Sequence, residues 1–198
     1  IEGLDFLLIN NESQDDSLKE AEIFSKAHQR VFLVDNKINN GSAGAFAQGI
    51  RYSKEHRYSF AYLIDQDTQF DAASMRSLLR ASVLLGDEYS VLCSAVYASE
   101  NHTLYLPHFR VMFDKFLCRF YPAKLDPKEL RKIDAGGNTG LFINIEVIGD
   151  ANMDESFFYH MEDYDFCLRV NQIKPIYLIP ESIIYHPNKY PKVSKLRQ

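Results

Sequence analysis

Short apolar runs that alternate with helix-forming segments constrain the fold of this chain more than any other feature. Four runs are predicted to be buried strands, at residues 4–9, 30–35, 58–64 and 90–95. Three segments with helical composition separate them, at residues 18–28, 45–53 and 72–85. Because strands that alternate with helices pair in parallel through right-handed crossovers, the sequence predicts an α/β fold with a mostly parallel central sheet flanked by helices.

The alternation is interrupted between residues 96 and 135. Phe109, Phe113, Phe116 and Phe120 recur there at helical spacing, which predicts a stripe of packing side chains. Regular structure is expected to resume afterwards, with strands at residues 140–145, 176–179 and 182–185 and a helix at residues 162–170. We interpret the interrupted segment as an excursion from the sheet.

Composition limits the classes of protein to which the chain can belong. With 198 residues, 46% of them apolar, it is long enough for one globular domain with a sizeable core. A net charge of −5 and a pI of about 5.7 leave no basic field, so no nucleic-acid partner is expected. Cys93, Cys118 and Cys167 each lie in an apolar context, which predicts buried free thiols in a reducing compartment. No apolar run approaches about 18 residues, so no membrane span is expected.

Two widely separated acidic clusters carry the chemistry that the sequence suggests. Asp65 and Asp67 follow the apolar run 60–64, and Glu162 and Asp163 follow an aromatic run. Closely spaced carboxylates at the end of a strand can hold a divalent cation at the edge of a sheet, and another carboxylate can serve as a general base. Both clusters also suit a structural role, because acidic residues cap helices and favour their first turns. A metal site together with a base would indicate chemistry on a diphosphate substrate.

The order of several motifs resembles that of the inverting family-2 glycosyltransferases, which have a GT-A fold. The similar segments are residues 10–15 (NNESQD), 39–50 (NNGSAGAFAQGI), 65–68 (DQDT), 136–140 (GGNTG) and 153–169 (MDESFFYHMEDYDFCLR), followed by His186. Together they cover nearly the whole chain in the family's order. The resemblance implies a single catalytic domain over residues 1–198 that lacks the family's first N-terminal strand.

The resemblance also implies roles for individual residues. Asp65, Asp67 and His186 are the expected ligands of a Mg²⁺ or Mn²⁺ ion. Asp163 is the expected general base, and Glu162 is expected to orient the acceptor. The residues expected to bind the donor and its nucleotide are Asn10, Asp15, Asn39, Gly41, Asp65 and Gly137.

Two residues depart from the family's pattern in the donor motifs. Asn10 stands where the family usually has an aspartate that contacts the nucleotide, and Ala47 replaces the usual asparagine of the glycine loop. Both departures bear on nucleotide affinity more than on the fold. The loop glycines, Gly41 among them, suit either close approach to a ligand or a tight turn from strand to helix, and the sequence favours neither.

The resemblance implies transfer of a sugar, with inversion, from a nucleotide-diphosphate donor to a glycan or lipid-linked acceptor, in cell-surface polysaccharide synthesis. Residues 65–68 are most similar to rhamnosyltransferases that use dTDP-rhamnose, whereas residues 40–46 with His186 resemble galactofuranosyltransferases that use UDP-galactofuranose. We favour the first slightly.

Two alternatives stay open, a sugar-nucleotide nucleotidyltransferase and a GT-A module that binds without catalysis. The family and the lack of an export signal predict a cytoplasmic location. Peripheral attachment to the inner membrane face and a homo-oligomeric state are also left open.

Overall fold

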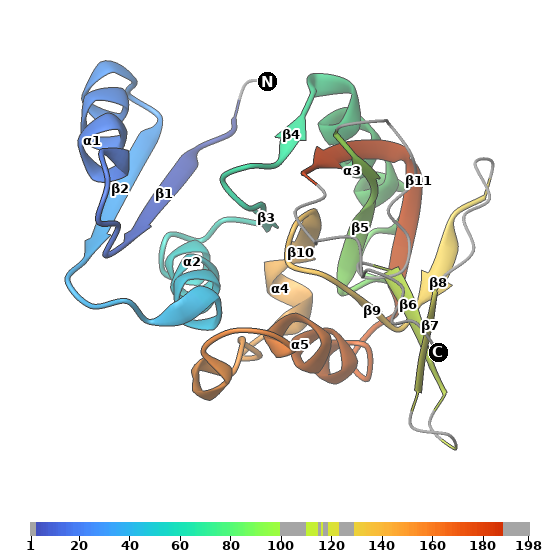
Figure 1. The fold of residues 1–198 in the computed structure, drawn as a ribbon. Coiled ribbons are helices and arrows are strands. Elements are labelled where there is room, and N and C mark those ends of the chain that lie inside the picture. The colour runs from blue at the N-terminus through green and yellow to red at the C-terminus, as the bar shows by residue number, and fades with distance from the viewer. Residues whose placement is uncertain (1–2, 100–109, 115, 117–118, 123–128, 188–198) are drawn as a thin grey trace, which may run out of the picture.

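Three sheets and the helices packed on them make up the described part of the chain (Figure 1). The computed structural model describes residues 3–99, 110–114, 116, 119–122 and 129–187. Its strands are β1 (Phe6–Asn11), β2 (Val31–Asn36), β3 (Phe60–Leu63), β4 (Gln69–Phe70), β5 (Val91–Ala98), β6 (Arg110–Asp114), β7 (Arg119–Pro122), β8 (Arg131–Ile133), β9 (Ala135–Gly136), β10 (Leu141–Asn144) and β11 (Ile176–His186). Its helices are α1 (Ser17–Ala27), α2 (Gly41–Glu55), α3 (Ala72–Leu85), α4 (Ile145–Ile148), α5 (Glu162–Val170) and the 3₁₀ turn η1 (Glu155–Phe157).

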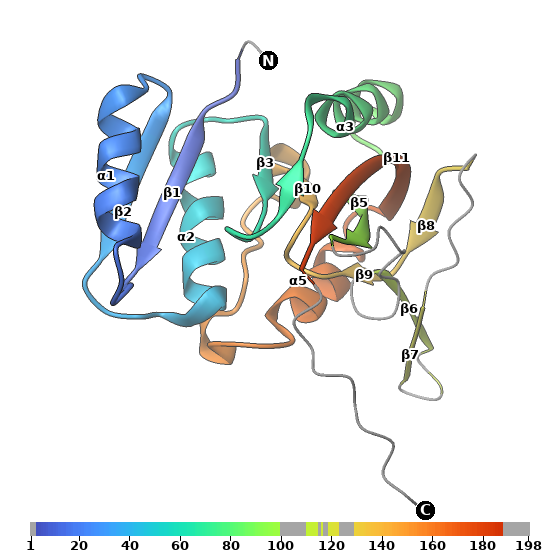
Figure 2. The same cartoon turned by 45° about the horizontal axis from the view of Figure 1, so that its top comes forward.

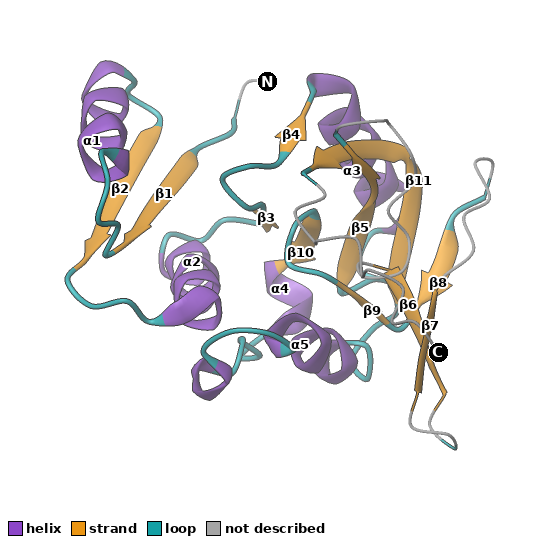
Figure 3. Cartoon of the chain, in the orientation of Figure 1, coloured by secondary structure: helices purple, strands orange, loops and turns teal. Residues whose placement is uncertain are grey.

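The central sheet has the strand order β3-β10-β5-β11-β4, with β8 also paired to β11 (Figure 3). The prediction of a mostly parallel sheet is wrong, because β5 and β11 pair in parallel whereas β10 is antiparallel to both β3 and β5. β10 begins at the edge where β3 ends, and there the Gly140 amide donates to the Leu63 carbonyl at 2.8 Å. The sheet is therefore mixed.

β1 and β2 form a separate parallel pair, and α2 joins this pair to the central sheet. Gly49 on α2 lies close to Ile9 on β1, while Ile50 belongs to the core cluster that includes Ala61 on β3. At the other end of α2, the Asn11 side chain donates to the Gly41 carbonyl at 2.9 Å. The first turn of α2 therefore lies at the carboxyl ends of β1 and β2.

The two faces of the central sheet bury separate apolar clusters. Because side chains alternate along a strand, Leu141 and Ile143 face one cluster while Phe142 faces the other. The first cluster includes residues of α2 and α5, and the second is closed by α3. Figure 2 shows α3 on one side of β5 and β11 and α5 on the other. The candidate site residues described below lie at the edge of the sheet where β3 ends.

The elements themselves are largely those predicted. The expected helices at residues 72–85 and 162–170 are α3 and α5. The two late strands form one strand, β11, whose pairing with β5 shifts register between Ile179 and Ile183. The helical spacing of phenylalanines proved misleading, because β6 and β7 form an antiparallel hairpin and Phe116 between them is 94% exposed. Phe109 lies outside the described residues.

The predicted burial of the cysteines is confirmed for the two that the structure describes. Cys93 and Cys167 are buried, and Cys118 lies outside the described residues. Within the described ranges, none of the helices combines the length and the apolar character that crossing a membrane requires.

We expect Leu78→Ala to lower the free energy of unfolding by about 3 kcal/mol, because Leu78 is fully buried between α3 and the sheet. Val83 lies on the same helix but is 85% exposed, so Val83→Ala should change the free energy of unfolding by less than about 0.5 kcal/mol. Urea denaturation of both variants measures the difference. Equal effects would contradict the placement of α3 on the sheet.

Candidate metal and catalytic site

Asp65, Asp67 and His186 come together at the carboxyl end of β3. One ligand atom from each lies within 4.8 Å of the others. The His186 Nε2 atom is 3.2 Å from Asp67 Oδ1 and 3.7 Å from Asp65 Oδ2. Two carboxylates and an imidazole suit Mn²⁺, and the carboxylates also suit Mg²⁺, so these residues fit the cation that the sequence predicts.

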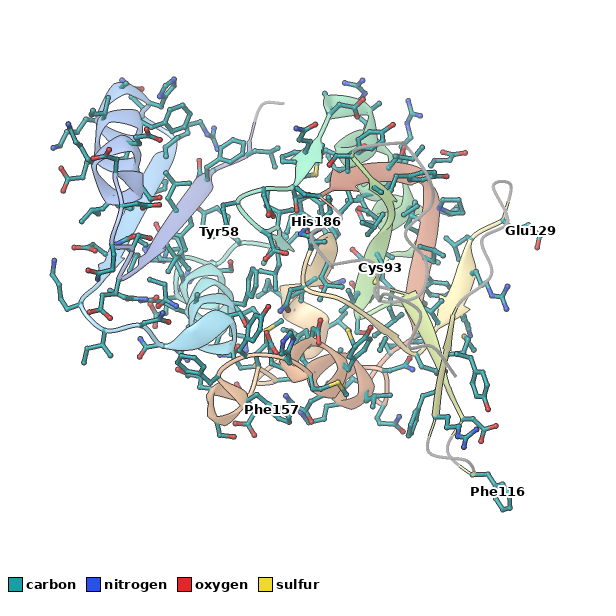
Figure 4. The ribbon with its side chains drawn as sticks, in the orientation of Figure 1. Tyr58, Cys93, Phe116, Glu129, Phe157 and His186 are labelled. Carbon is teal, nitrogen blue, oxygen red and sulfur yellow. The ribbon has the colours of Figure 1, made fainter. Side chains whose placement is uncertain are left out.

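Strand pairing explains why His186 reaches two aspartates so distant in sequence. The chain turns after β3, with the Thr68 amide donating to the Asp65 carbonyl at 3.0 Å, and then forms β4. β4 pairs antiparallel with β11, so that Gln69 lies opposite Tyr185. His186, the next residue, is also paired with Ala98 of β5. The end of β11 is therefore fixed from both sides, and Figure 4 shows His186 near the end of β3.

The hydrogen bond of His186 sets which ring nitrogen points at the aspartates. Its Nδ1 atom lies 3.0 Å from the Pro187 carbonyl oxygen. Because a carbonyl only accepts, Nδ1 carries the proton in the neutral ring, and Nε2 presents its lone pair toward Asp65 and Asp67. This is the orientation that a metal-binding histidine requires.

The electrostatics of Asp65 favour a bound positive charge. Burial raises the pKa of the Asp65 carboxyl above its usual value, and the nearby carboxylates of Asp67 and Glu162 raise it further. His186 acts in the opposite direction on that pKa. A cation between the carboxylates would offset the repulsion that opposes their ionisation.

Asp163 lies in the first turn of α5, close to the same edge of the sheet. Its Oδ2 atom accepts from the Asn138 amide at 3.2 Å, and its Oδ1 atom accepts from the Tyr164 amide at 2.8 Å. Burial raises the pKa of Asp163 to about 6, and the neighbouring Glu162 charge adds to the shift. The side chain is still partly accessible, so the carboxylate can accept a proton from a ligand.

Glu162 occupies a different environment from its neighbour Asp163. It is only 2% exposed, and its Oε1 atom accepts from the Ser42 hydroxyl and from the Asn138 side-chain amide, the latter at 2.9 Å. Among the described residues its Oε2 atom has no hydrogen-bond partner. The structure therefore places Glu162 at a junction between α2, α5 and the segment before β10, and its predicted role in orienting an acceptor stays a prediction.

Asn138 and Thr139 join the two acidic clusters, whereas the sequence identified residues 136–140 only as one motif, without separate roles for these two residues. Asn138 bonds to both Glu162 and Asp163 through its side chain and its amide. Thr139 Oγ1 accepts from the Asp65 amide at 3.5 Å and is hydrogen-bonded to the Thr68 hydroxyl. Polar residues between glycines, directly before the buried strand β10, were the signal that could have identified these roles.

The predicted donor residues lie mainly at the ends of β1 and β2. The Asn10 side chain donates to Asp35 Oδ1 at 2.8 Å and is 8% exposed. Asn39 Oδ1 accepts from the Gly41 amide at 2.8 Å, next to the start of α2. Gly137, at the other cluster, is buried immediately before Asn138. Asp15 accepts from the Ser17 amide at 3.0 Å, so its described hydrogen bond is local to the start of α1.

Gly41 shows why this loop needs a glycine. Its φ is +71°, and a Cβ atom there would lie 2.0 Å from the carbonyl oxygen of Phe158. The Ala43 amide donates to the same carbonyl at 3.2 Å. The sequence left open whether the loop glycines serve ligand approach or a tight turn. For Gly41 the structure gives a packing reason, because the segment before α5 approaches this residue closely.

The chain belongs to glycosyl transferase family 2. The sequence profile described as "Glycosyl transferase family 2" matches residues 2–148, most of the chain. No curated protein sequence matches the chain.

Solved structures with low sequence identity share the fold. GalNAc-T7, solved with UDP, GalNAc and Mn²⁺, is 15% identical with a TM-score of 0.72 over 92% of this chain and 37% of its own. TarS of S. aureus (residues 1–349), solved with UDP, is 12% identical with a TM-score of 0.62 over 92% of this chain and 50% of its own. The mannosyltransferase PcManGT of Pyrobaculum calidifontis, solved with GDP-Man and Mn²⁺, is 12% identical with a TM-score of 0.61 over 94% of this chain and 49% of its own. The chain thus spans half or less of each of these structures, and the GT-A fold predicted from the sequence is confirmed.

We expect His186→Ala to weaken Mn²⁺ binding by about 10-fold or more, because it removes the one nitrogen ligand of the three-residue group. His160→Ala, at an exposed histidine, is the matched control and should leave Mn²⁺ binding unchanged. Isothermal titration of the chain with MnCl₂, without any nucleotide, measures both. Equal affinities in the two variants would show that His186 is not a ligand.

Proposed function

We propose that this member of glycosyl transferase family 2 transfers a sugar from a nucleotide-diphosphate donor to an acceptor hydroxyl with inversion. One observation carries the proposal. Residues 138 and 139 bond at once to the Glu162–Asp163 pair and to the turn that holds Asp65. A candidate cation site and a candidate base therefore share one short segment, which a single displacement between them requires.

On the donor side, Asp65, Asp67 and His186 would hold a divalent cation. That cation, when bound, neutralises the charge that develops on a departing nucleoside diphosphate. The chain's own contribution is to orient the two carboxylates through the Thr68 turn and the β4–β11 pairing.

On the acceptor side, Asp163 would accept the proton of the attacking hydroxyl. Its two backbone hydrogen bonds fix the carboxylate, and each oxygen keeps a second lone pair for the incoming proton. A pKa near 6 makes it ionised at neutral pH yet more basic than an ordinary aspartate. Inversion follows if the acceptor approaches between Asp163 and the sugar, on the face away from the diphosphate.

We infer the donor class from similarity, with dTDP-rhamnose favoured and UDP-galactofuranose next. The structures of GalNAc-T7 and TarS contain UDP and that of PcManGT contains GDP-Man, which supports a nucleotide-linked sugar in general. The acceptor that we propose is a glycan or a lipid-linked glycan of a cell-surface polysaccharide.

A non-catalytic binding module is the second candidate, and two observations favour it. The side chain of Asn10, in the place of a nucleotide-binding aspartate, already bonds to Asp35. Ala47, in the place of an asparagine of the glycine loop, is fully buried in the core. Both observations point to weakened nucleotide contacts, and a test of nucleotide binding distinguishes this candidate from the transferase.

We expect one of UDP, dTDP and GDP to bind the chain by calorimetric titration, and to bind at least about 10-fold more tightly with Mn²⁺ present, because a cation held by the aspartates would offset their repulsion of the diphosphate. The nucleotide that binds identifies the donor class. Asp67→Asn should abolish the effect of Mn²⁺ on nucleotide affinity. Binding of none of the three nucleotides, with or without Mn²⁺, would favour the non-catalytic candidate.

We expect Asp163→Asn to lower kcat by about 10³-fold while donor affinity stays unchanged, because the variant loses the base but keeps its shape. For the native chain, kcat/KM should fall as the pH drops below about 6, since the protonated carboxyl cannot accept a proton. Asp165→Asn, on the same helix and paired with Arg169, is the control and should keep kcat within about 3-fold. Full turnover by Asp163→Asn would exclude Asp163 as the base.

A further inference from the structure

A run of exposed apolar side chains extends from the last residue of η1 to the start of α5. Phe157, Phe158 and Tyr159 are 39%, 52% and 60% exposed, and Met161 is 45% exposed. We call these four residues the aromatic loop. Single exposed apolar residues need no explanation, but four of them within five consecutive residues are a candidate binding surface. Figure 4 labels Phe157 at the surface beside α5.

The backbone holds these side chains outward. Phe158, His160 and Met161 have φ values of 55°, 72° and 69°, in the left-handed region that residues with a Cβ rarely adopt. The Phe158 carbonyl is fixed on the first turn of α2, where it accepts from the Ala43 amide at 3.2 Å and meets the glycine at position 41. The rings are therefore carried by a defined backbone, so that little backbone ordering is needed when a ligand binds.

The aromatic loop leads directly into the candidate base. Met161 is the N-cap of α5, and the next two residues are Glu162 and Asp163. At 3.8 Å between successive Cα atoms, Met161 and Asp163 are at most about 8 Å apart. The Ser42 hydroxyl contacts both the Phe158 carbonyl, at 3.5 Å, and the Glu162 carboxylate. A molecule resting on the loop would thus lie beside the carboxylate that is proposed to take the acceptor's proton.

Charge identifies the kind of molecule that the aromatic loop suits. Residues 154–163 include Asp154, Glu155, Glu162 and Asp163 and contain no Lys or Arg. The nearby Arg51 is already paired with Glu155, and Arg169 with Asp165. An anionic lipid surface would be repelled by this segment. A neutral sugar ring has an apolar face that packs on aromatic rings and hydroxyls that suit a surrounding of carboxylates.

We propose that the aromatic loop is a subsite for a neutral pyranose ring, which packs against Phe157, Phe158 and Tyr159 and directs a hydroxyl toward Asp163. The inference rests on the proposed function in that this ring belongs to the acceptor. According to this proposal the chain holds the acceptor through a sugar ring. An acceptor held through a lipid anchor would not need the aromatic loop.

The test is saturation-transfer NMR with methyl glycosides of rhamnose, glucose, galactose and N-acetylglucosamine as probes. We expect the ring C–H protons of at least one probe to receive saturation from the native chain. The signal should fall at least about 5-fold in Phe157→Ala/Tyr159→Ala. The matched control is Phe24→Ala on α1, where an exposed ring also lies against a histidine, and its signal should stay unchanged.

Three outcomes would overturn the proposal. They are no signal from any probe with the native chain, an equal loss of signal in the Phe24→Ala control, and binding of the native chain to phosphatidylcholine–phosphatidylglycerol vesicles that the double variant lacks. Titration of the same variants with a nucleoside diphosphate and Mn²⁺ separates this proposal from the proposed function. If the double variant still binds nucleotide but loses the glycoside signal, both the transferase function and the subsite are supported. If the glycoside signal depends on the aromatic loop but no nucleotide binds, the transferase function is contradicted and the subsite is still supported.

Discussion

The hydrogen bonds of the dipeptide Asn138–Thr139 are the constraint on which the rest of the site depends. Asn138 holds the carboxylates of α5, and Thr139 holds the turn that follows β3. Neither acidic cluster touches the other through a hydrogen bond that the described residues show, so the geometry between a cation and a base is set through this segment. A shift of the dipeptide would move both halves of the proposed chemistry relative to each other, even with every carboxylate in place.

The mixed sheet is what delivers this dipeptide to its position. β10 runs between β3 and β5 in the opposite direction, so its first residue lies where β3 ends. A parallel β10 would have begun at the other edge, with residues 138 and 139 far from Asp65. The same logic applies to β11, because its antiparallel pairing with β4 carries His186 back to the aspartate turn. The antiparallel pairings of β10 with β3 and of β11 with β4 therefore build the site beside the parallel pairs β5–β11 and β1–β2.

The sequence predicted individual elements and candidate site residues, but not the direction of strands or the contacts between distant segments. α3, α5 and the acidic residues were identified because periodicity, capping residues and motif order are written along the chain. The direction of β10 was not predicted, because an apolar run does not indicate whether the strand pairs parallel or antiparallel with its neighbours. The partner of Gly41 is the carbonyl of Phe158, which only the folded chain brings near, so the sequence left the reason for that glycine open. The motif of residues 136–140 was identified, but the separate roles of Asn138 and Thr139 were not, because these roles are hydrogen bonds to residues distant in the sequence.

The unfavourable ionisation of the buried carboxyls supports the same function as the geometry of the site. Burial and the charges of neighbouring carboxylates raise the pKa values of Asp65 and Asp163, which means that ionising these carboxyls is less favourable in the folded chain than in water. A protein that only needed capped helices would place these charges in water, as it does with Asp71 at the start of α3. Buried carboxylates that a cation would stabilise, beside one poised to take a proton, are the arrangement expected where a diphosphate leaves and a hydroxyl attacks. The aromatic loop, whose Phe158 carbonyl lies against Gly41, extends from Asp163 to the surface where an acceptor would first make contact.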